Sequence, residues 1–208
     1  MKFRPSIAYR STVPAAALLL VLTACGRGES GSVHDGIGFP ADSAITQALQ
    51  QDFAQNPGNA QARTLIATLG GDKGALGYKI HRVIYRQGAF EAQYDVSLHM
   101  AQAGQESLQK LYAGMVPEDQ RAKLPEQSLS AYEKWLGEQA TALEKTNAAQ
   151  AADLRRTLSA LGECYRNAKA GDDVLLMEGL SALVSPARDG WYAEKMESAR
   201  LQLRCLPL

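Results

Sequence analysis

Histidine, cysteine and tryptophan are scarce in this chain, whose 208 residues include three histidines, three cysteines and two tryptophans. The sequence contains none of the metal or redox motifs HExxH, CxxC and HxH. His81 and His99 lie on one predicted hairpin, but along its strands they are roughly 20 Å apart at about 3.3 Å per residue. We therefore expect no metal site and no cofactor, and we interpret these histidines as solvated side chains.

Net charge is also lacking, because 22 basic residues balance 22 acidic residues. If residues 1–24 are removed, 19 basic residues remain against 22 acidic ones, a net charge of −3. This balance argues against nucleic acid, whose phosphates require a basic surface, and against a polybasic attachment to anionic lipid. After the N-terminal segment, no apolar run approaches the roughly 18 residues of a membrane-spanning helix.

Recognisable catalytic patterns are missing as well. Residues 28–32, GESGS, lack the final glycine and the preceding strand of a serine nucleophile elbow. Residues 69–77, LGGDKGALG, lack the GxxxxGK[ST] pattern of a phosphate-binding loop. Glu91 and Asp95 share a strand face about 13 Å apart, too far to act on one bond as a retaining pair. We predict that the protein is not an enzyme; the alternative is a cofactor-free enzyme whose catalytic residues are dispersed along the chain.

The N-terminus, in contrast, has the form of an export signal. Lys2, Arg4 and Arg10 give it a basic start without an acidic residue, and residues 13–24, VPAAALLLVLTA, are largely apolar. This segment is too short to span the ~30 Å hydrocarbon layer of a membrane as a stable anchor.

The segment ends in Leu22-Thr23-Ala24-Cys25, which resembles the lipobox of bacterial lipoprotein precursors. The resemblance implies that residues 1–24 are cleaved and that Cys25 becomes the acylated first residue of the mature protein. It also implies the outer membrane, facing the periplasm of a Gram-negative cell, because Gly26 stands where an aspartate would signal retention in the inner membrane. Two alternatives remain: a secretory signal cut at a nearby A-x-A-like site, or an uncleaved membrane helix.

Once Cys25 is acylated, Cys164 and Cys205 are the remaining cysteines. Two cysteines in an oxidising compartment indicate one disulfide. A bridge that closes a loop of about 40 residues stabilises by about 4 kcal/mol on the chain-entropy account. The alternatives are two free buried thiols or a two-cysteine metal site, and the second lacks nearby histidines.

The remaining sequence predicts a tether and one domain. Residues 25–40 are rich in glycine and serine and are expected to form a flexible, lipidated tether, followed by a single domain over 41–208. Apolar residues at helical spacing predict helices near 45–53, 62–69, 108–115, 129–143 and 154–165, with a break at Asn147 favoured over one helix across 125–169. We also expect a buried central helix over 173–185 and a final helix over 191–203.

One antiparallel β-hairpin is predicted, with strands over 78–86 and 90–100, because apolar and polar residues alternate strictly in the second strand. A three-residue loop of Arg86, Gln87 and Gly88 sets the register. This register pairs Ile84 with Phe90, Ile80 with Tyr94, Tyr78 with Val96 and Lys79 with Asp95, and leaves Arg82 on the apolar face beside Ala92 and Tyr94. The predicted fold class is α+β, predominantly α, with about six or seven helices and this hairpin.

From these features we expect a non-catalytic protein-binding module, such as an inhibitor or immunity protein that acts on one periplasmic effector. The alternative is an accessory structural subunit of an envelope assembly or secretion complex. The expected partners are the membrane, through the lipid on Cys25, and a periplasmic protein, with no nucleic acid and no metal. Trp135, Trp191 and Arg82 are the candidate binding residues, since tryptophan and arginine are enriched at interaction hot spots.

Overall fold

The computed structural model describes residues 33–34, 37–198 and 200–206. The predicted signal segment, Cys25 and most of the predicted tether lie outside these residues. Within the tether, the strands β1 (Val33–His34) and β2 (Ile37–Gly38) pair as a short antiparallel ladder.

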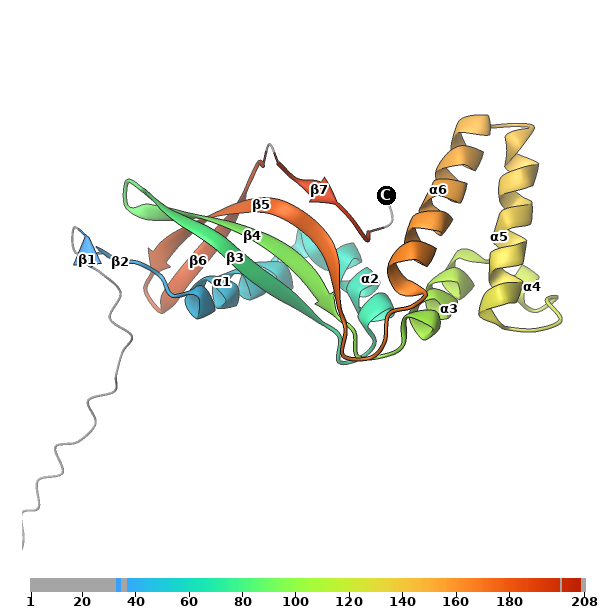
Figure 1. Cartoon of the computed structure of the whole chain (residues 1–208), viewed down its shortest axis with the longest axis horizontal. Helices are drawn as coiled ribbons and strands as arrows, with labels where there is room; N and C mark the ends of the chain where they lie inside the picture. Colours follow the sequence, from blue (N-terminus) through green and yellow to red (C-terminus); the bar gives the residue numbers. More distant parts are fainter. Residues whose placement is uncertain (1–32, 35–36, 199, 207–208) are drawn as a thin grey trace, which may run out of the picture. The chain divides into compact units, whose positions relative to one another are not determined.

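An antiparallel sheet forms much of the domain (Figure 1). Its strands are β3 (Ala75–Arg86), β4 (Ala89–His99), β5 (Asp173–Ala187) and β6 (Gly190–Met196), hydrogen-bonded in that order. The short strand β7 (Gln202–Leu203) pairs with β5 beyond the end of β6. The prediction of a predominantly helical domain with one hairpin is therefore wrong, because helices and a five-stranded sheet both make up large parts of this α+β domain.

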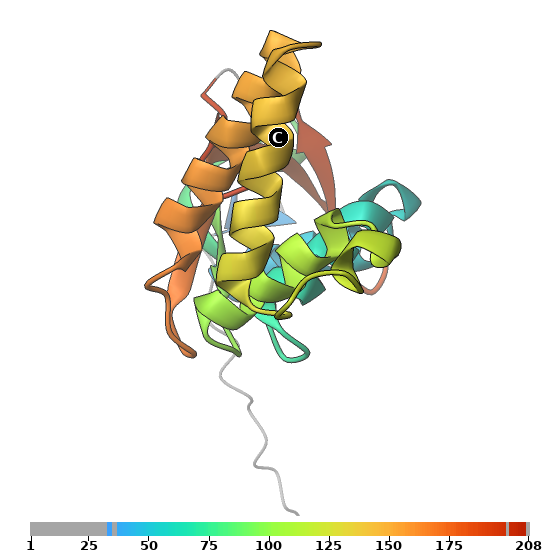
Figure 2. The same cartoon turned by 90° about the vertical axis from the view of Figure 1, so that its right-hand side faces the viewer.

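Six α-helices occur among the described residues. They are α1 (Asp42–Gln55), α2 (Ala60–Gly70), α3 (Gly104–Met115), α4 (Glu118–Arg121), α5 (Leu129–Glu144) and α6 (Ala148–Tyr165). A 3₁₀ turn, Pro57–Asn59, separates the first two, and the last four are inserted between β4 and β5. Figure 2 shows α5 and α6 side by side. The predicted break between them is confirmed, since the side chain of Asn147 accepts a hydrogen bond from the backbone N–H of Gln150 at 3.2 Å and caps α6.

The segment 173–187 is a strand, and the predicted central helix there is wrong. Its buried residues alternate, as Val174, Leu176, Leu180, Ala182 and Val184, which is the period of a strand. The alternation is hidden in the sequence because leucine and methionine also occupy partly buried positions on the other face. A short apolar run of this kind does not distinguish a buried strand from a buried helix.

The predicted final helix over 191–203 is also wrong, because these residues contribute β6 and β7. A two-residue turn at Arg188 and Asp189 joins β5 to β6, with Ala187 opposite Gly190. The apolar positions that suggested a helix serve a strand instead: Trp191 and Ala193 point to the core, while Tyr192 between them is 58% exposed.

The hairpin of β3 and β4 is confirmed, but its register changes along its length. Ile80 pairs with Tyr94 and Lys79 with Asp95 as predicted, whereas Ile84 pairs with Glu91 and Arg82 with Gln93. The difference arises because the loop has two residues instead of three, Gln87 and Gly88, both with positive φ. A β-bulge between Ile80 and Arg82 absorbs the extra residue and turns Arg82 away from the apolar face.

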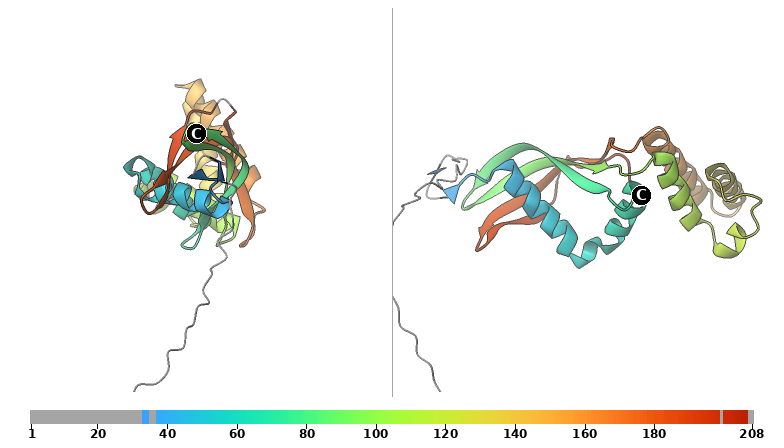
Figure 3. Two further views of the ribbon diagram at one scale, coloured as in Figure 1. Left: turned by 90° about the vertical axis from the view of Figure 1, so that its left-hand side faces the viewer. Right: turned by 90° about the horizontal axis from the view of Figure 1, so that it is seen from below.

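The core lies between the helices and one face of the sheet. Ile45 and Leu49 of α1, Leu69 of α2 and Leu98 of β4 are at most 5% exposed and belong to one buried cluster. The views in Figure 1 and Figure 3 show α1 and α2 against this face. No helix of the described part covers the opposite face of β3, β4 and β6, which we call the outer face (Figure 1).

Candidate functional site

The outer face of β4 is polar. Every second residue of this strand is buried toward the helices, so Glu91, Gln93, Asp95 and Ser97 point to the outer face. These four residues are half-buried although no helix covers them. Because neighbouring side chains partly bury them, these four side chains can form hydrogen bonds with defined partners instead of being surrounded by water.

Irregularities in three strands meet on this face. The bulge at His81 lies in β3, and register shifts between β4 and β5 fall on both sides of Val96. In β5, the backbone of Gly179 has φ +71°, a value that residues other than glycine rarely adopt. Such bulges redirect side chains and are common beside functional sites.

A row of hydrogen bonds connects these irregularities, and we call His81, Asp95, Gly179 and Ser198 the bulge row. His81 Nε2 lies 2.5 Å from Asp95 Oδ2, and Asp95 Oδ1 accepts the backbone N–H of Gly179 at 2.9 Å. The hydroxyl of Ser198, in the connection from β6 to β7, donates to the carbonyl of Gly179. The row therefore joins three strands and the 197–201 connection across the sheet.

The row keeps Asp95 ionised. Burial by itself raises the pKa of this carboxyl, but the N–H of Gly179, the hydrogen bond with His81 and the charge of Lys79 outweigh burial and lower it overall. At neutral pH the carboxylate therefore presents a fixed negative charge to the imidazole of His81.

A second carboxylate of the outer face is also occupied. Glu91 accepts a hydrogen bond from the amide of Gln93 at 3.0 Å and forms a two-pronged contact with Arg86, at 2.9 Å from Nε and 2.7 Å from Nη2. The hydrogen bonds from Gln93 and Arg86, and the charge of Arg82 nearby, lower the pKa of Glu91. The negative charges of Glu91 and Asp95 are thus both balanced by neighbours.

A hollow of ≈ 470 Å³ lies at the bulge row, and we call it the outer hollow. Its walls include His81, Arg82, Gln93, Ser181, Glu197 and Arg200. Its volume is in the range of small-ligand sites, and its walls come from β3, β4, β5 and the 197–201 connection. Neither Arg82 nor Arg200 has a carboxylate partner within 4 Å in the described part of the chain.

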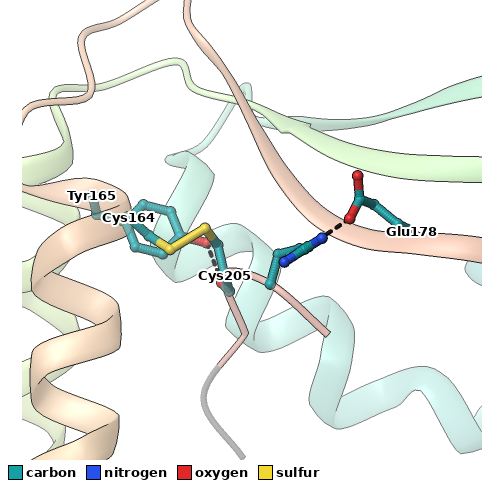
Figure 4. The surroundings of a disulfide bond; sticks show 5 residues. Cys164, Tyr165, Glu178 and Cys205 are labelled. Carbon is teal, nitrogen blue, oxygen red and sulfur yellow. Dashed lines mark hydrogen bonds and ion pairs between the residues drawn. A yellow bond between two sulfur atoms is a disulfide. The ribbon is translucent and has the colours of Figure 1, made fainter. Parts of the chain in front are cut away.

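The predicted cysteine pair secures one wall of the outer hollow. Cys164 of α6 and Cys205 lie at disulfide distance, with an S–S separation of 2.05 Å (Figure 4). The hydroxyl of Tyr165 donates to the carbonyl of Cys205 at 2.8 Å, and Arg204 contacts Glu178 at 2.5 Å. These contacts hold the segment directly after the 197–201 connection against α6 and β5.

The three candidate binding residues have different surroundings. Arg82, predicted on the apolar face, is exposed on the outer face because of the bulge at His81. Trp135 and Trp191 are partly buried and pack against the core, and the ring of Trp191 meets Phe90 edge-on at 5.6 Å. Trp191 also borders a smaller hollow between α1 and β6, together with Tyr192. The structure does not bring the three residues together.

Sequence reasoning missed the bulge row. His81 and His99 are both exposed on the hairpin as expected, but each has a carboxylate partner, Asp95 and Asp173 respectively. A glycine within the apolar run 174–184 was the available signal, because glycine inside a strand often marks a bulge. That signal has no meaning until the segment is known to be a strand.

The described residues provide neither a cluster of metal ligands nor a helix suited to span a membrane. No group of three or more histidine, cysteine, aspartate or glutamate side chains is placed to hold a metal ion in this part of the chain. None of the helices that the structure describes combines the length and the apolar character that crossing a membrane requires.

The outer hollow combines one histidine with two arginines. Its histidine is oriented by a carboxylate, a common arrangement for proton transfer, but no described serine or cysteine lies within hydrogen-bond distance of His81. Its two arginines provide planar, multiply donating groups that suit oxyanions. Comparison of the chain with protein-family models, with curated protein sequences and with solved structures finds no match.

Proposed function

We propose that this protein is a lipid-anchored, non-catalytic protein-binding module on the periplasmic side of the outer membrane, and that the outer face of the sheet contacts its partner. Anchoring rests on the resemblance of residues 22–25 to a lipobox. An inhibitor or immunity role against one periplasmic effector is the specific form of the proposal.

The observation that carries the proposal is a sheet face without a covering layer. A sheet normally buries one face against the core and leaves the other in water, but this outer face also holds a hollow and an ordered charge network. Tyr192 of the edge strand β6 is 58% exposed; it alternates with the buried Ala193, which assigns it to the outer face, at the edge where it also borders the smaller hollow beside α1. Tyrosine is enriched at protein interfaces because its ring is apolar and its hydroxyl forms hydrogen bonds.

Affinity purification of the full chain from gently solubilised membranes tests the proposal. We expect one protein to co-purify in a stable complex with the native chain and to be lost with Tyr192→Ala. Met115→Ala is the matched control, because Met115 is also a large exposed apolar residue, at 38%, but lies at the end of α3. The control variant should retain the partner.

Two results would contradict the proposal. Recovery of no protein partner, together with a hydrolytic activity in the pure chain, would replace a binding module with an enzyme. Co-purification of several membrane components, with failure of an envelope assembly when the protein is deleted, would favour an accessory subunit over an inhibitor.

A further inference from the structure

We propose that the outer hollow binds a carboxylate group of the partner protein between Arg82 and Arg200; this inference rests on the proposed function. The group is supplied by an acidic side chain or the C-terminus of the partner.

Two carboxylates at the hollow already have partners within the chain. Glu91, which lines the hollow, is balanced by Arg86, and Asp95, next to the lining residues His81 and Gly179, is held by His81 and the N–H of Gly179. A basic residue of the partner would have to displace Arg86 from Glu91, or a hydrogen bond from Asp95, to reach either carboxylate. Of the carboxylates at the hollow, Glu197 is left without a cation within 4 Å among the described residues, and the two arginines outnumber it.

Two arginines of the hollow have no carboxylate partner among the described residues. Arg82 projects from β3 and Arg200 from the 197–201 connection, and both line the outer hollow. Within the described residues neither guanidinium has a carboxylate within 4 Å, in contrast to Arg86, Arg155, Arg166 and Arg204. Guanidinium groups match the geometry of a carboxylate by donating two parallel hydrogen bonds.

The net charge of the hollow favours a carboxylate over a phosphate group. Glu197 also lines the hollow, and the described residues supply it with no cation within 4 Å. Arg86 balances Glu91 and Lys79 lies near Asp95, so Arg82 and Arg200 against Glu197 leave a single positive charge when His81 is neutral. One carboxylate balances this charge, whereas a phosphate group of about −1.5 to −2 would exceed it. The amide oxygen of Gln93 and the hydroxyl of Ser181 complete neutral polar walls that can bind the adjoining backbone.

The test uses the peptides Ac-Gly-Glu-Glu-Gly-NH₂ and Ac-Gly-Gln-Gln-Gly-NH₂, each with an uncharged fluorophore on its C-terminal amide, so that the glutamates supply the only carboxylates. The full chain is used in detergent. Fluorescence anisotropy should show saturable binding of the glutamate peptide and none of the glutamine peptide at the same concentrations. We expect R82Q and R200Q each to weaken binding at least about fivefold, because each removes one charged hydrogen-bonding group. R188Q, at the turn between β5 and β6, is the matched control and should bind as the native chain does.

Three results would overturn the inference. Equal binding of the two peptides would show that the carboxylate is not recognised, and equal weakening by R188Q would show attraction to general positive charge. Competition by inorganic phosphate at lower concentration than by acetate would identify a phosphate site instead. If the glutamate peptide fails while Tyr192→Ala still releases the partner, this inference fails and the proposed function stands; if the peptide binds but no partner is found, the proposed function fails.

Discussion

At the scale of single residues, Asp95 links β3, β4 and β5 through the two oxygens of one carboxylate. A backbone N–H at a bulge has lost its usual partner in the ladder, and Asp95 replaces that partner for Gly179. The same carboxylate fixes the imidazole of His81 in the outer hollow. Asp95 therefore both stabilises the bulge at Gly179 and orients the side chain of His81 in the hollow.

Asp95→Asn should destabilise the domain by about 1–2 kcal/mol at pH 7, because a charged acceptor becomes neutral. The lowered pKa of Asp95 means that its contribution is complete above the unfolded value of about 4 and is lost as pH falls through the folded value. Urea unfolding from pH 3 to 7 should show a smaller loss of stability below pH 4 for the variant than for the native chain. Asp189→Asn, at an exposed turn, should follow the native curve, and identical curves for Asp95→Asn would contradict the prediction.

The close approach of the backbone of Arg200 leaves no room for a side chain at position 179, so glycine is required there. A Cβ at this position would lie 2.5 Å from the carbonyl oxygen of Arg200, and φ is +71°. Gly179→Ala should therefore destabilise by about 2 kcal/mol or more. Gly137→Ala in α5 meets nothing within 4 Å and should instead stabilise by up to about 1 kcal/mol. Chemical unfolding of the two variants tests the opposite signs, and equal effects would show that the bulge tolerates a side chain.

At the scale of elements, the segments that the sequence predicts correctly have one apolar face. The helices α1, α3, α5 and α6 show helical spacing, and β4 shows strict alternation of buried and half-buried residues. The strand β5 could not be recognised because apolar residues occupy both of its faces. The slip in the register of β3 could not be predicted either, since a bulge and a shorter turn compensate each other there.

The disulfide belongs to this scale because it holds the element β7, which has only two residues. Cys164→Ser with Cys205→Ser should lower the free energy of unfolding by up to about 4 kcal/mol, as expected for a closed loop of 41 residues. Hydrogen exchange should become faster in β7 and the 197–201 connection while β3 and β4 stay protected at low denaturant. Uniform acceleration over all strands would show that the bridge stabilises the whole domain without a local role. Wild-type exchange rates in β7 would show that strand pairing alone holds this segment.

At the scale of the whole molecule, the sheet joins two hairpins that are distant in sequence. The strands β3 and β4 precede the four inserted helices, and β5 and β6 follow them. The residues that pair between β4 and β5, such as Phe90 and Val184, are therefore far apart in the sequence. The outer hollow exists only after this pairing, because its walls come from both hairpins. This is the physical reason that residue patterns located the candidate Arg82 but not its neighbours Ser181 and Arg200: periodicity reports local structure, not which strands pair.

Attachment of the whole molecule to the membrane is expected from the lipobox resemblance alone. Acyl chains contribute about 0.8 kcal/mol for each buried methylene, so two or three chains on Cys25 hold the protein permanently whereas an unmodified chain has no such anchor. Cys25→Ser should therefore move the protein from the membrane fraction to the soluble periplasmic fraction. The variant with Cys164→Ser and Cys205→Ser should stay in the membrane fraction, which separates lipidation from a general effect of removing cysteines. Membrane retention of Cys25→Ser would mean that the apolar N-terminal segment itself is the anchor, and mass spectrometry of the N-terminus would then find residues 1–24 uncleaved.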